Sequence, residues 1–331
     1  MIKELEASVG FDNSKVYRYF TYRLTNWCNY RCSYCVQGNK VHDDCPKLES
    51  TEYYVNDAKL CRRFLDELNE DFPVPFEKIT LIGGEVGLID LKEVVKEIIT
   101  DRLAILNITT NLSVIRNFIE VYKVVSDYNK EHNTNIKVNV SASFHEEFAS
   151  LDKFIANYKE LDKASVEICG RKDSIGLEMV VHDDNLDIAK EFLKRCDEEN
   201  VKRCCINIKR DRLSVIMKGE TEGSPVTEKT VKWIEENYNT RGGSRTSQYY
   251  AKYDDGSEGT ISRLDLVNCN TSGLAEGFTG WICKDRHRMV RKDEHGFRFS
   301  CGNVCGRNPK DIICPQKYCS LCGYVHLEKR D

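Results

Sequence analysis

The stretch that decides the fold is Leu24-Thr25-Asn26-Trp27-Cys28-Asn29-Tyr30-Arg31-Cys32-Ser33-Tyr34-Cys35, which follows a strand-like run over residues 17–24 and opens a polar loop. Closely spaced cysteine thiolates of this kind hold iron–sulfur clusters. Three thiolates can hold three irons of a four-iron cubane and leave the fourth iron open to another ligand. A structural zinc site usually closes its shell with a fourth Cys or His, so a zinc loop is the alternative.

The composition describes an ordinary globular protein with an unusual number of cysteines. The chain has 331 residues, of which 40% are hydrophobic and 31% charged, with a net charge of −4. This balance gives no electrostatic footprint for nucleic acid, and no apolar stretch approaches the length of a membrane span. Sixteen cysteines without an apolar signal segment indicate metal binding in a reducing compartment, so we expect a cytoplasmic, oxygen-sensitive protein.

Strand-like and helix-like segments alternate about six times over residues 17–210. Such alternation predicts a parallel sheet with helices outside it, in too few units for an eight-fold barrel. Ligands of such sheets bind at the carboxyl ends of the strands. The expected strands are 17–24, 79–82, 103–108, 136–144, 175–181 and 205–208. The expected helices are 60–68, 91–99, 114–125, 148–161 and one that Asp184 caps before Leu186. Cys61 lies on the apolar face of the first helix, which predicts a packed core thiol.

The remaining segments carry weaker patterns. Residues 1–16 read as a polar lead-in, too short for a separate peptide-binding domain. Residues 211–270 are less regular, with one helix expected over 228–238 and a hairpin turning at Asp254-Asp255-Gly256. We therefore divide the chain into a core, a bridging region and a cysteine-rich module, with boundaries at 1–212, 213–270 and 271–331.

The cysteine loop resembles the signature of the radical S-adenosylmethionine (SAM) superfamily, C-x3-C-x2-C with an aromatic residue before the last cysteine, here Tyr34. The resemblance covers roughly the first two thirds of the chain. It implies an α/β fold with a partial (β/α)6 TIM-like barrel, and a [4Fe-4S] cluster on Cys28, Cys32 and Cys35. In the family, SAM chelates the open iron, and an electron from the cluster cleaves it to a 5′-deoxyadenosyl radical that abstracts hydrogen from a substrate.

Polar residues at later strand ends are candidates for SAM binding. Gly83-Gly84-Glu85 resembles the family's GGE motif, although Val86 stands where many members have Pro. Glycine admits a ligand close to the main chain, but a simple turn uses the same residues. The resemblance places further contacts on Tyr34, Asn111, Ser143 and Glu178. The alternatives are helix capping for Asn111 and Ser143, and a structural ion pair for Glu178.

Other residues are candidates for proton or hydrogen transfer. His145 and His182 follow strands at the expected ligand edge and can act as general bases, with solvated loop histidines as the alternative. Some family members use a thiol to return a hydrogen atom to a substrate radical. Cys169, Cys204 and Cys205 are the candidates, although a buried core thiol is the favoured interpretation of each. A basic cluster near the last strand can attract an anionic substrate or form a solvated face.

A second group of cysteines lies in the C-terminal module. A hairpin-like pattern, 289–291 and 296–299, separates Cys283 from Cys301, and Cys319 and Cys322 follow. This resembles the twitch module, the shortened form of the SPASM extension of radical SAM enzymes. The resemblance implies one auxiliary [4Fe-4S] cluster on these cysteines, fully ligated and therefore suited to electron transfer. Two further cysteines, Cys305 and Cys314, can replace a ligand or help to hold a second auxiliary cluster. A zinc ribbon is the alternative.

The two resemblances therefore imply a radical SAM oxidoreductase that draws electrons from a donor such as flavodoxin or ferredoxin. We expect a small, sugar- or nucleotide-like substrate, because no fused peptide-recognition domain precedes the first strand. Modification of a ribosomally made peptide is the alternative. Twitch members include an aminoglycoside dehydrogenase and the molybdopterin-precursor cyclase, but the chain lacks the cyclase's Gly-Gly tail. From another class, a non-catalytic zinc-binding module would bind zinc rather than iron. Neither nucleic acid nor membrane is an expected partner.

Overall fold

The structure is a computed structural model, which describes residues 2–6, 17–35, 47–172, 174–201, 204–208, 248–262, 282–283, 289–293, 296–299 and 326–328, with isolated residues between 227 and 236. The chain forms two compact units. One comprises residues 1–22, 63–79 and 244–331, and the other comprises residues 23–62 and 80–243.

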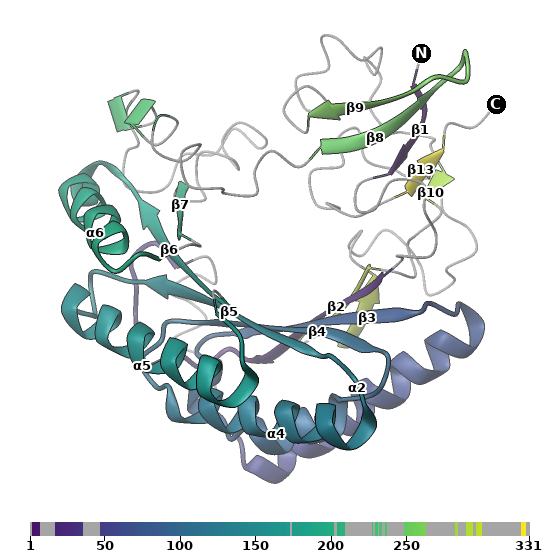
Figure 1. Cartoon of the computed structure of the whole chain (residues 1–331), viewed down its shortest axis with the longest axis horizontal. Coiled ribbons are helices and arrows are strands. Elements are labelled where there is room, and N and C mark those ends of the chain that lie inside the picture. The colour runs from purple at the N-terminus through teal and green to yellow at the C-terminus, as the bar shows by residue number, and fades with distance from the viewer. Residues whose placement is uncertain are drawn as a thin grey trace. The chain divides into compact units, whose positions relative to one another are not determined.

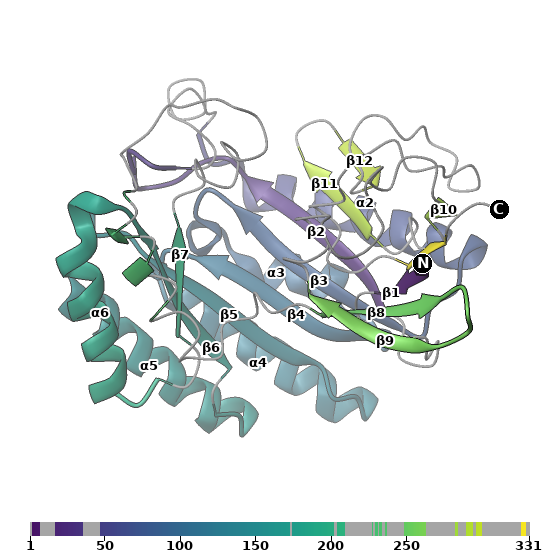
Figure 2. The ribbon, with the colours of Figure 1, turned by 90° about the horizontal axis from the view of Figure 1, so that it is seen from above.

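A parallel sheet of seven strands, with one antiparallel strand at its edge, is the main element of the fold. Its strand order is β12-β11-β2-β3-β4-β5-β6-β7, so β2 to β7 follow one another as sequence order predicts. This confirms the α/β fold with a parallel sheet, and Figure 2 shows β4, β5 and β6 side by side. The strands in chain order are β2 Tyr17–Thr25, β3 Phe76–Gly83, β4 Leu103–Thr110, β5 Lys137–Phe144, β6 Ile175–Val181 and β7 Cys204–Ile208.

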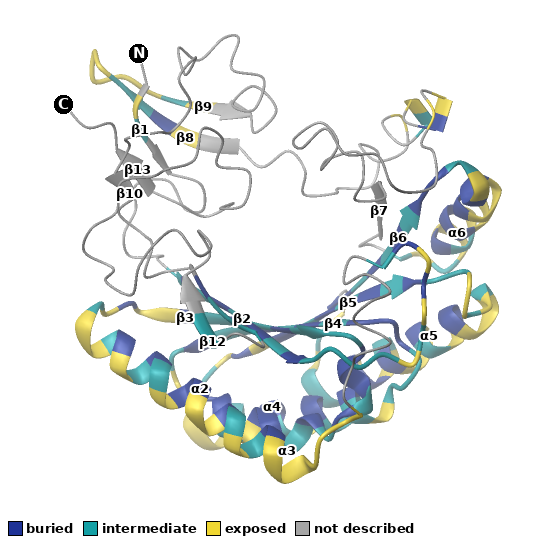
Figure 3. Cartoon of the chain, turned by 180° about the vertical axis from the view of Figure 1, so that it is seen from behind, coloured by how far each residue is buried: buried dark blue, intermediate teal, exposed yellow. Residues whose placement is uncertain are grey.

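Alternate residues of these strands are buried, because helices cover one face of the sheet. In β5, Val138, Val140, Ala142 and Phe144 are buried, while the residues between them are exposed or half-buried. Figures 1 and 3 show α4, α5 and α6 together on this face, with their buried residues toward the sheet. The opposite face carries the polar residues of the strands. The helices are α2 Thr51–Asp71, α3 Leu91–Ile98, α4 Arg116–His132, α5 Leu151–Cys169 and α6 Leu186–Glu198.

The helix boundaries show where local sequence signals succeed. Cys61 is fully buried in α2, which confirms the predicted core thiol. Gly170 ends α5 in the left-handed conformation, φ 64°, and its N–H donates to the carbonyl of Val166. The predicted cap at Asp184 is wrong, because a 3-10 turn, Asp183–Asn185, separates β6 from α6.

A second, antiparallel sheet joins both ends of the chain, in the order β10-β13-β1-β8-β9. Its strands are β1 Ile2–Glu6, β8 Gln248–Tyr253, β9 Glu258–Ser262, β10 Ile282–Cys283 and β13 His326–Glu328. The expected hairpin at Asp254-Asp255-Gly256 is confirmed, with Gly256 at φ 82°. The sequence predicted a polar lead-in over residues 1–16 and did not predict the strand at residues 2–6, which pairs with β8 and β13.

The C-terminal hairpin predicted at 289–299 is also present. Its strands, β11 Met289–Asp293 and β12 Gly296–Phe299, are antiparallel to each other, and β11 is parallel to β2. Gly296 has φ 89° at the turn, as the sequence requires. Phe297 stacks on Phe64 with a centroid separation of 4.2 Å. Because β11 pairs with β2, the hairpin is part of the main sheet.

Two features are absent from the described part of the chain. No described helix combines the length and apolar character that crossing a bilayer requires. Among the same described residues, no three His, Cys, Asp or Glu side chains converge as the ligands of a metal ion.

Candidate functional site

The cysteine loop begins where β2 ends, at the carboxyl edge of the parallel sheet. Cys32 is 5% exposed, Cys28 and Cys35 are half-buried, and all are free thiols. The backbone N–H of Cys35 donates to the carbonyl of Cys32 at 3.0 Å, which closes a turn between these residues. The loop therefore presents three unpaired thiols from one short segment.

The glycines after β3 allow the start of this loop to lie directly against the strand end. The backbone N–H of Gly84 donates to the carbonyl of Thr25, and that of Glu85 to the carbonyl of Trp27, both at 2.8 Å. A Cβ at Gly84 would lie 2.0 Å from the Trp27 oxygen, and one at Gly83 would lie 2.2 Å from the Thr25 oxygen. Only glycine fits at this distance, so the pair fixes the backbone immediately before Cys28.

Glu85 connects the ends of two strands inside the protein. Its side chain is fully buried, and its carboxylate accepts hydrogen bonds from Gly87 N at 2.7 Å, Thr110 Oγ1 at 2.7 Å and Asn111 N at 2.5 Å. Burial outweighs these donors and raises the pKa of Glu85 to about 7. The carboxylate thus fixes Asn111, and SAM contact by this motif stays a prediction.

Asn111 links the next strand end to the cysteine loop. Its Nδ2 donates to Asn29 Oδ1 at 2.9 Å and lies 3.8 Å from Cys28 Sγ, while its Oδ1 accepts from Ser113 N. The backbone N–H of Tyr30 donates to the same sulfur at 3.3 Å. Donors to a ligand sulfur stabilise its thiolate form and tune an iron–sulfur cluster. The bond from Ser113 N is a local one of the kind that capping residues make, but the N-cap of α4 is Ile115, so Asn111 does not cap that helix.

The three thiols do not converge as the ligands of a single metal ion in the structure, but three thiols on one loop are the donor set of a [4Fe-4S] cluster, in which each would bind a different iron. Burial raises the pKa of Cys28 and raises that of Cys32 to about 12, so the isolated thiols keep their protons at neutral pH. Cluster iron would be bound with release of those protons. Cys28, Cys32 and Cys35 would be its ligands, with the N–H groups of Tyr30 and Asn111 directed at the first of them.

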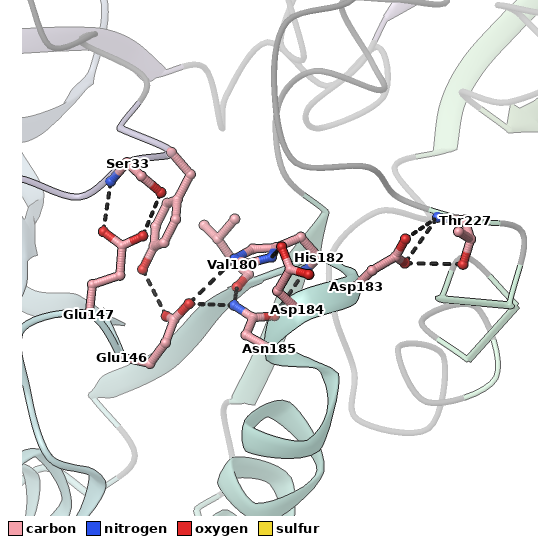
Figure 4. A network of polar contacts seen from close by, with 10 residues as sticks. Ser33, Glu146, Glu147, Val180, His182, Asp183, Asp184, Asn185 and Thr227 are labelled. Carbon is pink, nitrogen blue, oxygen red and sulfur yellow. Dashed lines mark hydrogen bonds and ion pairs between the residues drawn. The ribbon is translucent and has the colours of Figure 1, made fainter.

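The residues after β5 contact the loop from its other side, as part of the polar network in Figure 4. Glu147 accepts from Ser33 N at 2.7 Å and from Ser33 Oγ at 2.5 Å. The hydroxyl of Tyr34 donates to Glu146 Oε2 at 2.8 Å and lies 3.2 Å from His145 Nδ1. Tyr34, the predicted aromatic, is thereby 6% exposed. Sequence reasoning missed both glutamates, although two acidic residues after a strand end are a usable signal.

The two predicted bases lie beside Tyr34. Its ring centroid is 5.8 Å from that of His145 and 5.8 Å from that of His182. Burial lowers the pKa of His145, although Glu146 and other nearby carboxylates oppose the shift. His182 is 7% exposed, and its Nε2 lies 3.4 Å from Glu146 Oε1. Neither histidine is therefore a solvated loop residue.

Ser143 and Glu178 meet on the face of the sheet away from the helices. Glu178 Oε1 accepts from Ser143 Oγ at 2.8 Å and from Ser141 Oγ at 3.2 Å. In register, Glu178 lies between Ser143 of β5 and Cys205 of β7, and Cys204 pairs with Leu177. The alternative of a helix cap for Ser143 does not describe its contact, because its hydroxyl donates to Glu178.

The other predicted thiols are placed differently. Cys169 ends α5, which runs back from the carboxyl edge of the sheet, and its thiol donates to the carbonyl of Tyr122 at 3.7 Å. It therefore does not join the cysteine loop. Cys283 lies in β10 of the second sheet, in register with Leu327. The other predicted auxiliary ligands lie outside the described residues, namely Cys301, Cys305, Cys314, Cys319 and Cys322.

Fold and site together define a class: a parallel α/β sheet with a three-cysteine loop at the carboxyl end of its β2 strand. No protein-family profile and no curated protein matches the chain. Solved structures do match. One, described as native anSMEcpe with bound AdoMet and Kp18Cys peptide, has a TM-score of 0.46 and 16% identity, over 81% of this chain and 71% of that one.

A second match, native anSMEcpe with bound AdoMet, has a TM-score of 0.45 and 15% identity, over 66% of this chain and 59% of that one. A third, a tagged form of anSMEcpe with bound AdoMet, has a TM-score of 0.41 and 15% identity. In that match the aligned part spans 58% of this chain and about half, 51%, of the other. At these identities the function of this chain rests on its own residues.

Proposed function

We propose that the protein is a radical SAM enzyme. The observation that carries the proposal is the loop of free thiols Cys28, Cys32 and Cys35, fixed at the carboxyl edge of a parallel sheet with two N–H donors near the sulfur of Cys28. A [4Fe-4S] cluster on these thiols would supply the electron that cleaves SAM to a 5′-deoxyadenosyl radical. The spacing of the cysteines, read from the sequence, supports the same chemistry.

The residues around the loop would orient it and bind SAM. Gly83 and Gly84 fix the approach of residues 25–27, and Glu85 fixes Asn111 through its backbone N–H. The proposed contacts to SAM come from the loop and from the strand ends that surround it. They are Tyr34, Gly83, Gly84, Glu85, Asn111, Ser143 and Glu178.

Proton and hydrogen transfer are assigned to two places on the sheet, the segment after β5 and the start of β7. His145 is the proposed base, because burial lowers its pKa and so favours the neutral imidazole, which can accept a proton. Its Nδ1 lies within hydrogen-bonding distance of the Tyr34 hydroxyl, so Nε2 is the nitrogen for this role. Among the thiols, Cys205 is the proposed hydrogen donor, because its register position lies beside Glu178.

We further propose one auxiliary [4Fe-4S] cluster in the C-terminal module, on Cys283, Cys301, Cys319 and Cys322. The hairpin β11–β12, which the module resemblance requires between the first two cysteines, supports this assignment. A fully ligated cluster would pass electrons, which suits a net oxidation of the substrate.

The substrate is a small molecule or a peptide. The sequence led us to expect a small molecule, on the ground that residues 1–16 are too few for a peptide-recognition domain. That argument no longer favours a small molecule over a peptide, because residues 2–6 belong to a second sheet with β8 and β13. Two of the matching solved structures are described with a bound peptide, Cp18Cys or Kp18Cys, so peptides are included among the substrates to be tested.

The test is formation of 5′-deoxyadenosine by anaerobically reconstituted, reduced protein. Cys28→Ala should abolish it. The matched control is Cys61→Ala, which removes a fully buried thiol of α2 and should leave SAM cleavage intact. Bound zinc in place of iron, or equal activity of Cys28→Ala and wild type, would refute the proposal. Deuterium transfer from labelled peptides and sugars into 5′-deoxyadenosine then identifies the substrate class.

A further inference from the structure

The two residues between Cys32 and Cys35 are each bound by one carboxylate from the segment after β5. Ser33 donates through both its backbone N–H and its hydroxyl to Glu147, with one carboxylate oxygen for each donor. Ser33 and Glu147 are both exposed, and Figure 4 shows the Glu147 carboxylate directed at Ser33. The contact therefore holds the outer side of the turn.

The inner side of the turn is held by a buried network. Tyr34 donates to Glu146, whose side chain is 8% exposed. The other carboxylate oxygen of Glu146 accepts from Asn185 Nδ2 at 2.6 Å, and that amide also donates to the carbonyl of Val180. Figure 4 shows Glu146 between the loop and this end of β6. A hydrogen bond to a buried carboxylate is stronger than a neutral one, so this connection constrains Tyr34.

The two carboxylates place negative charge beside the cysteine loop. Glu146 and Glu147 are adjacent, and each accepts hydrogen bonds from the turn between Cys32 and Cys35. A neutral glutamine has one acceptor oxygen, whereas each of these carboxylates accepts hydrogen bonds through both of its oxygens. The carboxylates differ from neutral acceptors in bond strength and in the negative potential that they add near the thiols.

We propose that Glu146 and Glu147 are positioning residues that keep Cys32 and Cys35 in the geometry of cluster ligation and lower the reduction potential of the cluster. The inference rests on the proposed function. It assigns a role to two residues that the cysteine motif does not contain. Glu147 acts through Ser33, and Glu146 acts through Tyr34, so neither needs to touch iron or SAM.

The experiment follows iron release from the reconstituted protein to a chelator under anaerobic conditions. Glu147→Gln and Ser33→Ala should each release iron about three- to tenfold faster than wild type, the range expected for loss of a charge-assisted hydrogen bond at an exposed site. Tyr34→Phe should also accelerate release, because it removes the only hydroxyl that binds Glu146 Oε2 in the described network. The matched control is Glu160→Gln, an exposed residue of α5, which should release iron at the wild-type rate.

Two further measurements separate positioning from a general loss of stability. The double variant Ser33→Ala/Glu147→Gln should release iron more slowly than the product of the single effects predicts, because both changes remove parts of one contact. Glu147→Gln should raise the midpoint potential of the cluster, whereas Ser33→Ala should change it less. Urea unfolding of the metal-free variants reports any effect on the fold itself.

The outcomes distinguish this inference from the function on which it rests. Wild-type protein that binds no iron–sulfur cluster overturns both. A cluster-containing wild type whose Glu147→Gln and Ser33→Ala variants match it in release rate and potential overturns only the positioning role. A double variant whose rate of iron release equals the product of the two single effects would also overturn it, because changes at independent sites combine in that way.

Discussion

The substitution Gly84→Ala tests whether the glycine pair positions the cysteine loop. The new Cβ would lie 2.0 Å from the Trp27 carbonyl oxygen and 2.7 Å from that of Asn26. Ordinary carbon–oxygen contacts are about 3.3 Å, so the strand end and the loop must separate by about 1.3 Å. All of the nearest atoms belong to the backbone, so no side-chain rotation relieves the contact.

A separation of this size breaks two hydrogen bonds. The bonds Gly84 N to Thr25 O and Glu85 N to Trp27 O are both 2.8 Å long, and each is lost once the loop moves. At net values near 1 kcal/mol each, and more where a group stays unsatisfied, the loss of unfolding free energy is on the order of 3 kcal/mol. The displaced backbone leads directly into Cys28, so iron retention should fall as well.

Urea unfolding followed by circular dichroism, together with iron per chain after reconstitution, measures both effects. The matched control is Gly259→Ala in β9, where a Cβ would meet its nearest atom at an ordinary 3.4 Å. The control should keep wild-type stability. If Gly84→Ala instead unfolds within about 0.5 kcal/mol of wild type and retains its iron, the glycines do not position the loop.

Three further predictions follow from single residues. Burial raises the pKa of Glu85 from 4.5 to about 7, so the folded state holds its proton more tightly than the unfolded state. The stabilisation that this difference gives to the folded state is complete below pH 4.5, and it declines by on the order of 3 kcal/mol as the pH rises to about 7. Glu85→Gln should remove that slope from urea-unfolding curves measured between these pH values, and an unchanged slope would contradict the assignment. Arg18 is fully buried, and its guanidinium donates to the carbonyls of Leu65, Leu68 and Phe72 near the end of α2. Arg18→Met should lower the unfolding free energy by about 3 kcal/mol, while exposed Arg63→Met should change it little; equal effects in thermal unfolding would argue against the role. Asn111→Ala removes a donor near Cys28 Sγ and the bond to Asn29, so the cluster potential should fall; voltammetry that finds no shift would exclude that contact.

The parallel sheet could be predicted from the sequence because the pattern that identifies each strand lies within a short stretch of residues. Each strand from β2 to β6 is an apolar or alternating run next to a helix with an apolar stripe, and burial follows that pattern. The burial of Cys61 was predicted for the same reason. Helix α5 extends to Cys169, beyond the predicted end at 161, because its last turns pack against α4 and end at Gly170.

Contacts between distant segments left no such local signal. Strand β1 pairs with β8 and β13, which lie far along the chain, and five residues alone carry no pattern that identifies these partners. Glu85 accepts hydrogen bonds from Thr110 and the backbone of Asn111, contacts that its sequence motif did not predict, and its contact with SAM stays a prediction. The roles of Glu146 and Glu147 depend on the loop that β5 brings beside Ser33, and pairing of that kind appears only in three dimensions.

Metal and acid-labile sulfide content of the anaerobically reconstituted protein tests the central claim most directly, when wild type is compared with the Cys28→Ala/Cys32→Ala/Cys35→Ala variant. A cubane on this loop predicts that the variant contains about four fewer irons and four fewer sulfides per chain than wild type. Equal iron in the two proteins, stoichiometric zinc in wild type, or disulfides among these cysteines would contradict it.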